Sequence, residues 1–303
     1  MVIGPEHNPL LEPLDVGSAR LPNRIVLAPM AGVTTSAFRR RMKAFGAGLV
    51  TTEMVSAYGL LYENRRTLEY LRFVPEERPV ALQLFGQDPQ AVAAAVTVLL
   101  EREPRPDVID LNMGCPVRKV MKTGAGAALL GDPARAAAVA AAATAAATTV
   151  PVTAKIRSGL QPGEVVAVEV ARRLEQAGIA ALGVHPRAAS QLYRGRADHS
   201  ITAAVAAAVT VPVLASGDVT GAAAALRILA LTGAAGVMVA RSALGDPWLL
   251  ADIVLGSTGP DPHATRWWPS CGVFSPWRLR RWAVAGPFAG SASSSPGISG
   301  RPA

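Results

Sequence analysis

The segment DVIDLNMGCPVRKVMKTGAG (residues 107–126) places a cysteine where an apolar run gives way to a polar, glycine-rich loop. Cys115 lies between a glycine and a proline, whereas a structural cysteine more often lies inside a strand or helix. The cations of Arg118, Lys119 and Lys122 follow it and would favour the thiolate if they approach the sulfur. This setting favours a nucleophile or a general acid; the alternative is an inert loop thiol.

Three further polar side chains lie at or near the ends of short apolar runs. Lys155 in VPVTAKIR is costly to bury unless it is paired or reaches a cavity, and a cation there could stabilise negative charge on a bound ring. The alternative is a lysine that faces solvent. Gln83 in LQLFG offers a donor and an acceptor to an amide-like ring edge. His185 in GVHPR could hydrogen-bond a cofactor or donate a proton, although a lone histidine is more often structural.

Two small-residue turns could hold a phosphate group. The segments ASGD (215–218) and ARSALGDP (240–247) permit close approach of the backbone, and Arg241 supplies a forked donor. The alternative is two ordinary turns and a surface arginine. No Cys-x-x-Cys spacing, HExxH motif or Ser/His/Asp arrangement is present, so we predict neither a metal site nor a hydrolase.

Eight short apolar runs, each ending in polar or small residues, must position these groups. They are RIVLAPM (24–30), GLVTTEM (48–54), PVALQLFG (79–86), DVIDLNMG (107–114), VPVTAKIR (150–157), AALGVHPR (180–187), VPVLASGD (211–218) and GVMVARSA (236–243). Helix-compatible stretches lie between them, such as 35–47, 88–103, 163–178 and 220–233, and several begin at Asp-Pro, Ser or Thr and end at Gly.

Eight strand–helix units predict an α/β fold, a (β/α)₈ TIM barrel, within residues 1–255. The competing doubly wound sheet would place its phosphate glycines after the first strand, where RIVLAPMAGV has no G-x-G-x-x-G. Glycines gather instead after the seventh and eighth strands, where barrels build phosphate sites. The carboxyl ends of the strands would then bring the polar residues named above to one face.

The composition limits the partner, the compartment and the class of protein that we expect. The chain has 303 residues, half of them hydrophobic, and a net charge of +8 that modestly favours a polyanionic partner. Two cysteines cannot form a disulfide framework and suit a reducing compartment. The first residues lack a signal-peptide pattern, and the Ala-rich runs are typical of buried helix faces. We expect a cytoplasmic protein without a membrane segment, and infer no obligate protein partner.

Seven segments, taken together and in order, resemble the tRNA-dihydrouridine synthases over residues 8–255. They are APMAGVTTSAFR, QLFG, DLNMGCPVRKVMKTGAGAALL, VTAKIRSG, GVHPRAASQLYRGRADHS, LASGDV and VARSALGDPWLL. The resemblance implies an FMN-dependent barrel that reduces specific uridines of tRNA with NADPH. It also implies a small C-terminal helical domain that grips tRNA.

The resemblance also implies a role for each matching residue. Cys115 would donate a proton to C5 of uracil after hydride from reduced flavin reaches C6. Asn112 would orient the base or the flavin, and the substrate would pass Arg118, Lys119, Lys122 and Arg187. The flavin would be held by Pro29, Met30, Ala31, Gln83, Lys155, His185, Ser216, Gly217, Asp218, Ala240 and Arg241. Ser216 and Ala240 stand where the family often has Asn and Gly, so we expect a slightly altered phosphate site.

The composition changes from residue 256 onward. Residues 256–303 contain four of the five tryptophans and five arginines against one aspartate, with no sustained helical period. We expect the family's helical domain to be missing or replaced here. Three interpretations stay open: a frame-shifted or truncated end, a divergent basic tail that binds RNA through Arg and Trp, or an unrelated folded module.

Two other functions also stay open at this point. One is a different FMN barrel that acts on a small molecule, such as a dihydroorotate- or enoate-reductase-like enzyme. The other is a flavin- or RNA-binding protein with little turnover. The NMGCPVRKVMKTGAG segment and the basic charge favour the tRNA-modifying enzyme over both.

Overall fold

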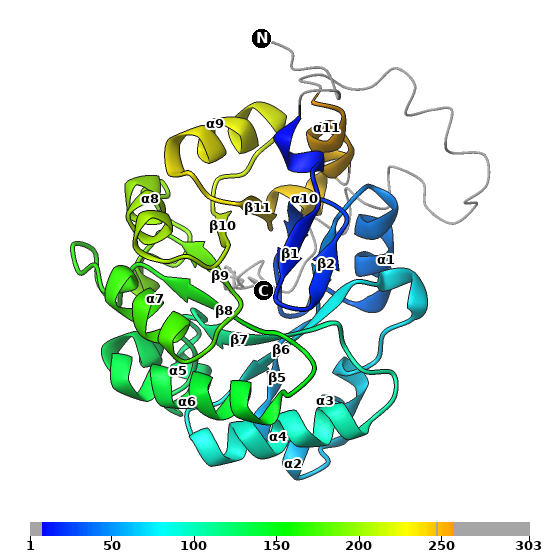
Figure 1. Ribbon diagram of the computed structural model, residues 1–303, viewed down its shortest axis with the longest axis vertical. Helices are drawn as coiled ribbons and strands as arrows, with labels where there is room; N and C mark the ends of the chain where they lie inside the picture. The colour runs from blue at the N-terminus through cyan, green and yellow to red at the C-terminus, as the bar shows by residue number, and fades with distance from the viewer. Residues whose placement is uncertain (1–7, 247, 257–303) are drawn as a thin grey trace, which may run out of the picture. The chain divides into compact units, whose positions relative to one another are not determined.

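Eight parallel strands form a closed ring in the computed structural model, which describes residues 8–246 and 248–256 (Figure 1). The strands in ring order are β3 (Ile25–Leu27), β4 (Leu49–Thr51), β6 (Val80–Phe85), β7 (Val108–Met113), β8 (Val152–Arg157), β9 (Ala181–His185), β10 (Val213–Ser216) and β11 (Gly236–Val239). The ring closes because β3 pairs with both β4 and β11, and β4 pairs with β6. The predicted (β/α)₈ barrel is confirmed, and the doubly wound alternative is wrong.

Helices surround the ring and connect its strands. Their bounds are α1 (Ser36–Ala44), α2 (Ala57–Leu61), α3 (Arg65–Tyr70), α4 (Pro89–Glu101), α5 (Arg118–Met121), α6 (Pro133–Ala146), α7 (Ala167–Gln176), α8 (His199–Ala208), α9 (Ala222–Thr232), α10 (Ser242–Gly245) and α11 (Leu249–Leu255). The Asp-Pro pairs start helices as predicted. Asp88 caps α4 by accepting from the Gln90 amide, and Asp132 caps α6 by accepting from the Arg135 amide.

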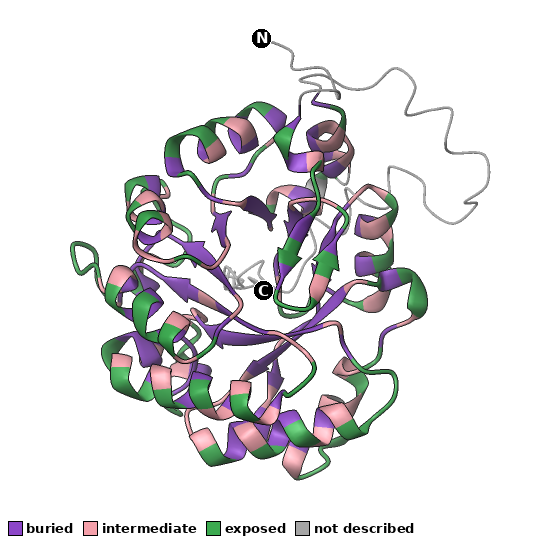
Figure 2. Ribbon diagram, viewed as in Figure 1, coloured by how far each residue is buried: buried purple, intermediate pink, exposed green. Residues whose placement is uncertain are grey.

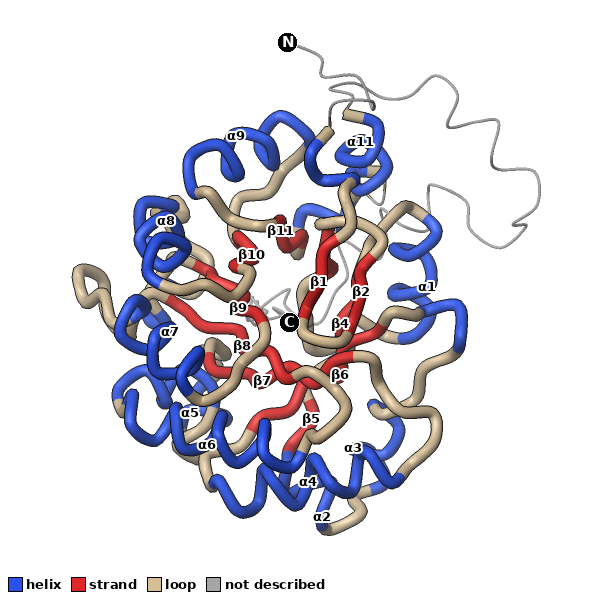
Figure 3. The backbone as a smooth tube through the Cα atoms, in the orientation of Figure 1, coloured by secondary structure: helices blue, strands red, loops and turns tan. Residues whose placement is uncertain are grey.

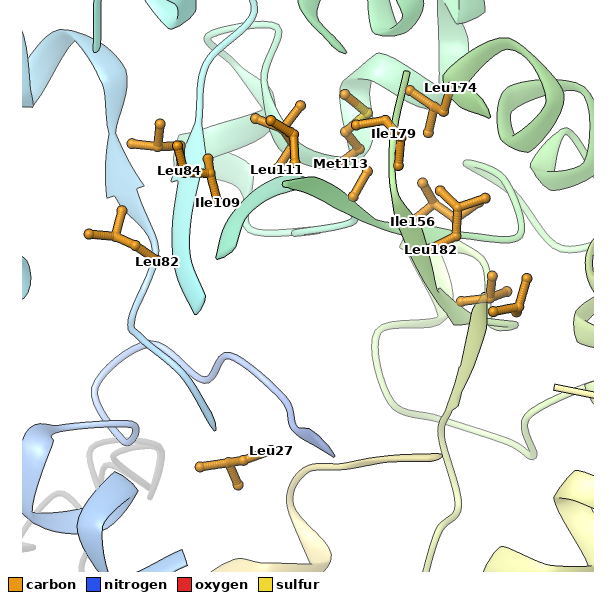
Figure 4. Packing of buried hydrophobic residues seen from close by; sticks show 14 of the residues in the cluster. Leu27, Leu82, Leu84, Ile109, Leu111, Met113, Ile156, Leu174, Ile179 and Leu182 are labelled. Atoms are coloured by element: carbon orange, nitrogen blue, oxygen red, sulfur yellow. The ribbon is translucent and has the colours of Figure 1, made fainter. Parts of the chain in front are cut away.

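Each barrel strand has two different faces, because successive side chains alternate. The outward set, which includes Leu82, Ile109 and Ile156, belongs to one large buried cluster with the inner faces of the helices. Figure 4 shows part of this layer, with Leu174 of α7 close to residues of the strands, and Figure 2 shows the buried strands inside a ring of helices that are exposed on their outer side. The outward layer therefore packs the strands against the helices, and the inward face at the carboxyl ends can carry chemistry.

A short hairpin closes one end of the barrel. Strands β1 (Leu14–Val16) and β2 (Ala19–Leu21) pair antiparallel, and Figure 3 shows them in front of the ring. Leu14, Val16 and Leu21 pack against inward residues from the amino-terminal halves of the strands, including Val108 and Leu214. This end is apolar and filled, so polar inward side chains are left for the carboxyl ends.

The predicted domain boundary after residue 255 falls at the end of α11, and the atypical segment predicted for residues 256–303 lies, apart from Gly256, outside the described residues. None of the helices within residues 8–256 has the length and apolar character that a bilayer crossing needs.

Candidate active site

Inward side chains of neighbouring strands gather at the carboxyl ends, as the sequence predicted. Asn112 of β7 lies beside Lys155 of β8, and one step further Arg157 lies beside His185 of β9. On β7 and β9 these polar residues follow Val108 and Ala181, which belong to the apolar inner cluster, so the barrel interior changes from apolar to polar along its axis. The arrangement places four groups that can bind or move protons on one face.

Lys155 is a half-buried cation of this face. Glycine at position 183, on the neighbouring strand, makes room for its stem, because a Cβ there would lie 3.3 Å from Lys155 Cγ. Burial, and then the nearby charge of Arg157, lowers the pKa of Lys155 to about 8, against the opposing effect of Asp110. Its ammonium makes no hydrogen bond within residues 8–256, so it is available to an acceptor on a ligand.

A hydrogen-bonded chain of side chains crosses three strands beneath this lysine. Asp110 accepts from Gln83 Nε2 and from Thr153 Oγ1, both at 2.7 Å. Gln83 Oε1 in turn accepts from Asn112 Nδ2 at 2.9 Å. Sequence reasoning gave no role to Asp110 or Thr153. The signal was present, since an acid inside the apolar run DVIDLNMG is as costly to bury as the lysine in VPVTAKIR.

Cys115 is held by its backbone at the start of the loop after β7. Its amide donates to Asn112 Oδ1 at 2.9 Å, and its carbonyl accepts from the Ala127 amide at 3.0 Å. Arg157 Nε donates to the preceding carbonyl, that of Gly114, at 3.0 Å. The half-buried thiol is thus fixed from both sides of the loop.

The thiol of Cys115 stays protonated at neutral pH. Burial raises its pKa above the usual value of a thiol, and this outweighs the lowering effects of the Val117 backbone, Arg157 and Lys155. The cations of α5 are not among the charges that act on it, contrary to the expectation that they favour a thiolate. A protonated thiol suits a general acid and does not suit a nucleophile.

His185 is a neutral ring with a fixed proton. Arg187 Nη1 lies 3.2 Å from His185 Nε2, and because a guanidinium only donates, Nε2 must accept and Nδ1 must carry the proton. Burial, followed by repulsion from Lys155, Arg157 and other cations, lowers the pKa of His185 far below its usual value. His185 can therefore donate a hydrogen bond from Nδ1, but it is not an acid at neutral pH.

Arg187 was predicted to meet the substrate, and the structure places it inside the protein. Its Nη2 donates to both carboxylate oxygens of Asp218, at 2.7 and 3.0 Å, and to the Gly195 carbonyl at 2.7 Å. Asp218 also accepts from the Ala197 amide at 2.7 Å. The Asp218 carboxylate is therefore occupied, and only its backbone is left to face a phosphate.

The two predicted phosphate turns lie next to each other. Ser242 Oγ donates to the Val219 carbonyl at 2.6 Å and so ties the turn after β11 to the turn after β10. Gly217 between them has φ of 105°, and a Cβ there would lie 2.9 Å from His185 Cδ2. Ser216 is buried and Ala240 half-buried at the ends of their strands.

Arg241 is exposed at the second turn. Its guanidinium carbon lies 4.0 Å from the ring centroid of Tyr193, a residue that sequence reasoning missed, and it makes no hydrogen bond within the described chain. Tyr193 is half exposed and lies in the loop after β9. No sequence pattern indicates that it would contact Arg241, which follows β11.

Pro29, Met30 and Ala31 lie in the loop after β3, at the same end of the barrel. Glu53 Oε1 accepts from the Gly32 amide at 2.5 Å, so a buried carboxylate fixes this loop. The predicted cations Arg118, Lys119 and Lys122 are exposed on and just after α5, beyond the Cys115 loop. No group of three or more potential metal ligands occurs within residues 8–256.

Comparison with known proteins identifies the family. The model of the dihydrouridine synthase (Dus) family matches residues 26–273. The chain belongs to the dihydrouridine synthase family. It is 40% identical over 238 residues to tRNA-dihydrouridine synthase B of Pseudomonas aeruginosa, covering 78% of this chain and 71% of that protein. A probable tRNA-dihydrouridine synthase of Rhodobacter capsulatus is 40% identical over 247 residues, covering 81% and 75%.

Solved structures share the barrel of this dihydrouridine synthase family member. A morphinone reductase variant in complex with tetrahydroNAD has a TM-score of 0.61 at 14% identity, over 84% of this chain and 93% of that one. A 2-naphthoyl-CoA reductase has a TM-score of 0.65 at 12% identity, over 82% and 52%. At these identities the likeness concerns the fold alone.

Proposed function

We propose that this protein reduces uridines in tRNA to 5,6-dihydrouridine, with FMN as its cofactor and NADPH as reductant. The observation that carries the proposal is a protonated thiol, Cys115, fixed at the same barrel face as Lys155, whose ammonium has no hydrogen-bond partner in the described part of the chain. An acid and a cation beside one another are what reduction of an enone-like ring requires. The names of the curated relatives point to the same reaction.

The residues at the carboxyl ends fit a flavin mononucleotide. Lys155 offers an unused ammonium, Gln83 offers the second hydrogen of its Nε2, and His185 offers Nδ1–H, so three donors could meet the pyrimidine edge of a flavin. Arg241 and the backbone of the turn at Gly217 could hold its phosphate. When bound and reduced, FMN would supply the hydride for C6 of uracil.

The protein's own residues supply the proton and the position. Cys115 donates its Sγ proton to C5 of the uracil, and burial keeps that proton in place until the base arrives. Asn112 sets the position of the thiol through the Cys115 amide. Arg118, Lys119 and Lys122 carry no ion pair within residues 8–256 and lie on the surface beside this loop, where tRNA phosphates would pass.

A reconstituted reaction tests the function. Purified protein, FMN and NADPH are incubated with tRNA that lacks dihydrouridine, and the nucleosides are measured by mass spectrometry. We expect dihydrouridine to form in amounts that exceed the enzyme. Oxidation of NADPH and reduction of a small enone, with no dihydrouridine in any tRNA, would favour a small-molecule reductase instead.

The affinity for FMN is expected to fall as the pH rises through about 8. Burial lowers the pKa of Lys155 to about 8, so the ammonium that would donate to the flavin is present below that pH and is lost above it. Fluorescence titration of FMN at a series of pH values measures the dissociation constant. Lys155→Met should bind FMN more weakly and show no inflection near pH 8; an inflection that survives in this variant would assign the titration to another group.

Removal of the cations on and just after α5 is expected to lower both the affinity for tRNA and the dependence of that affinity on salt. Lys119→Ala and Lys122→Ala should each reduce the slope of log K against log salt by roughly 0.7–0.9, the value of one phosphate contact. Arg172→Ala is the matched control, because Arg172 is also exposed and has no ion pair among the described residues, but lies on the outer helix α7. Equal slopes in all three variants would remove α5 from the RNA-binding surface.

A further inference from the structure

Asp110 is a buried carboxylate that the proposed chemistry does not use. It lies on the inward face of β7, with 6% of its surface exposed, between Gln83 of β6 and Thr153 of β8. Both neighbours donate to it at 2.7 Å. An acid in this position is expensive to bury, so its retention calls for a function.

Two backbone amides fix the directions of the hydrogen bonds around Asp110. The amides of Gly114 and Cys115 both donate to one oxygen, Asn112 Oδ1, at 3.2 and 2.9 Å. A backbone N–H cannot become an acceptor, so the other end of the Asn112 amide is Nδ2, which donates to Gln83 Oε1. The remaining group of Gln83 is then Nε2, and it needs an acceptor, which Asp110 supplies.

We infer that Asp110 is a positioning residue that holds the Gln83 amide with Nε2 toward the barrel interior and Oε1 toward Asn112, and so aims the second Nε2 hydrogen at the flavin edge. The inference rests on the proposed FMN site. Without an acceptor at position 110, Gln83 Nε2 is left unpaired in a buried place, and a flipped amide would set its N–H₂ against that of Asn112. Both arrangements lose the oriented donor.

The carboxylate also faces the other charged groups of this layer. Desolvation raises the pKa of Asp110, while the two donors and the charge of Lys155 lower it. An ionised and a protonated Asp110 can both accept from Gln83. The orientation therefore depends on the acceptor oxygen, and the negative charge is not required.

Two substitutions separate the acceptor from the charge. Asp110→Asn keeps an oxygen for Gln83 and can turn its Nδ2 to Thr153, whose hydroxyl accepts as well as donates. Asp110→Val removes both oxygens and suits a strand. We expect Asp110→Asn to bind FMN within about threefold of the parent, and Asp110→Val to bind about tenfold more weakly, as for one lost hydrogen bond.

Two controls test whether the effect runs through Gln83. Thr153→Val removes the other donor to Asp110 and should leave FMN affinity within about threefold of the parent. In a Gln83→Ala background, Asp110→Val should cause no further loss, because residues that act through one another are not additive. If Asp110→Val does not fold, as judged by thermal unfolding of the apoprotein, Asp110→Ala replaces it.

The outcomes distinguish this inference from the cofactor proposal. Failure of the parent protein to bind FMN contradicts the proposed function and this inference with it. If the parent binds FMN, then equal losses in Asp110→Asn and Asp110→Val overturn the inference, since charge would then be the cause. Parent-like affinity in Asp110→Val, or an undiminished loss in the Gln83→Ala background, overturns it as well.

Discussion

Replacement of Cys115 with alanine is expected to slow dihydrouridine formation by ~10²–10⁴-fold, the usual cost of losing a general acid. The thiol is half-buried and protonated, and its loop is fixed by backbone hydrogen bonds that alanine keeps. FMN affinity and NADPH oxidation without tRNA should therefore stay close to those of the parent. Single-turnover oxidation of the reduced enzyme by tRNA measures the step.

Cys271→Ala is the control, since the sequence predicts no role for the second cysteine; it should be as active as the parent. The pH profile adds a second check. Because burial raises the pKa of Cys115, the acid form persists through neutral pH, and the rate should fall only in the alkaline range. Full activity of Cys115→Ala would exclude the thiol from the reaction.

Glu77→Ala is expected to lower the free energy of unfolding by ~3–5 kcal/mol, as for one partner removed from a buried ion pair. Glu77 and Arg39 are 0% and 3% exposed, with Arg39 Nε 2.5 Å from Glu77 Oε2. Glu77 also accepts from the Ser36 hydroxyl and from the Val74 amide. Its loss leaves a guanidinium buried without its counter-charge. Urea denaturation of the apoprotein measures the change.

The exposed pair of Glu169 and Arg173 on α7 provides the control. Both side chains are about half exposed, so Glu169→Ala should hardly change stability. The buried pair also reaches the site, because Arg39 Nη1 donates to the Thr34 carbonyl at 2.5 Å, in the loop that includes Met30. Comparable stability losses in Glu77→Ala and Glu169→Ala would contradict this interpretation.

The strands and their polar ends could be predicted from the sequence because each lies within one short run. PVALQLFG is almost wholly apolar, and VPVTAKIR is apolar on the face that helices cover, and the ends of such strands meet on one side of a barrel. Lys155 and His185 could be found because a charge or an imidazole stands out against an apolar run. Their convergence then follows from topology alone.

Hydrogen-bond and ion-pair partners could not be predicted where they depend on how distant segments align in the fold. Asp110 contacts Gln83 and Thr153 only because β6, β7 and β8 pair at those positions. In the sequence, Gln83 and Thr153 lie 27 and 43 residues away from Asp110. Arg187 resembled a substrate ligand in the sequence, yet the turn after β10 gives it an ion-pair partner, the partly exposed carboxylate of Asp218. The sequence of one segment does not show how that segment aligns with a distant one.

The closure of the ring by β3 and β11 sets a condition on biosynthesis. The first barrel strand, Ile25–Leu27, finds its second neighbour only when Gly236–Val239 has been made. A chain that stops before Val239 would present two unpaired strand edges, with free amide and carbonyl groups along each. Such edges pair readily with other chains. A ribosome that pauses before the last barrel strand is made would therefore hold a nascent protein that is prone to aggregation.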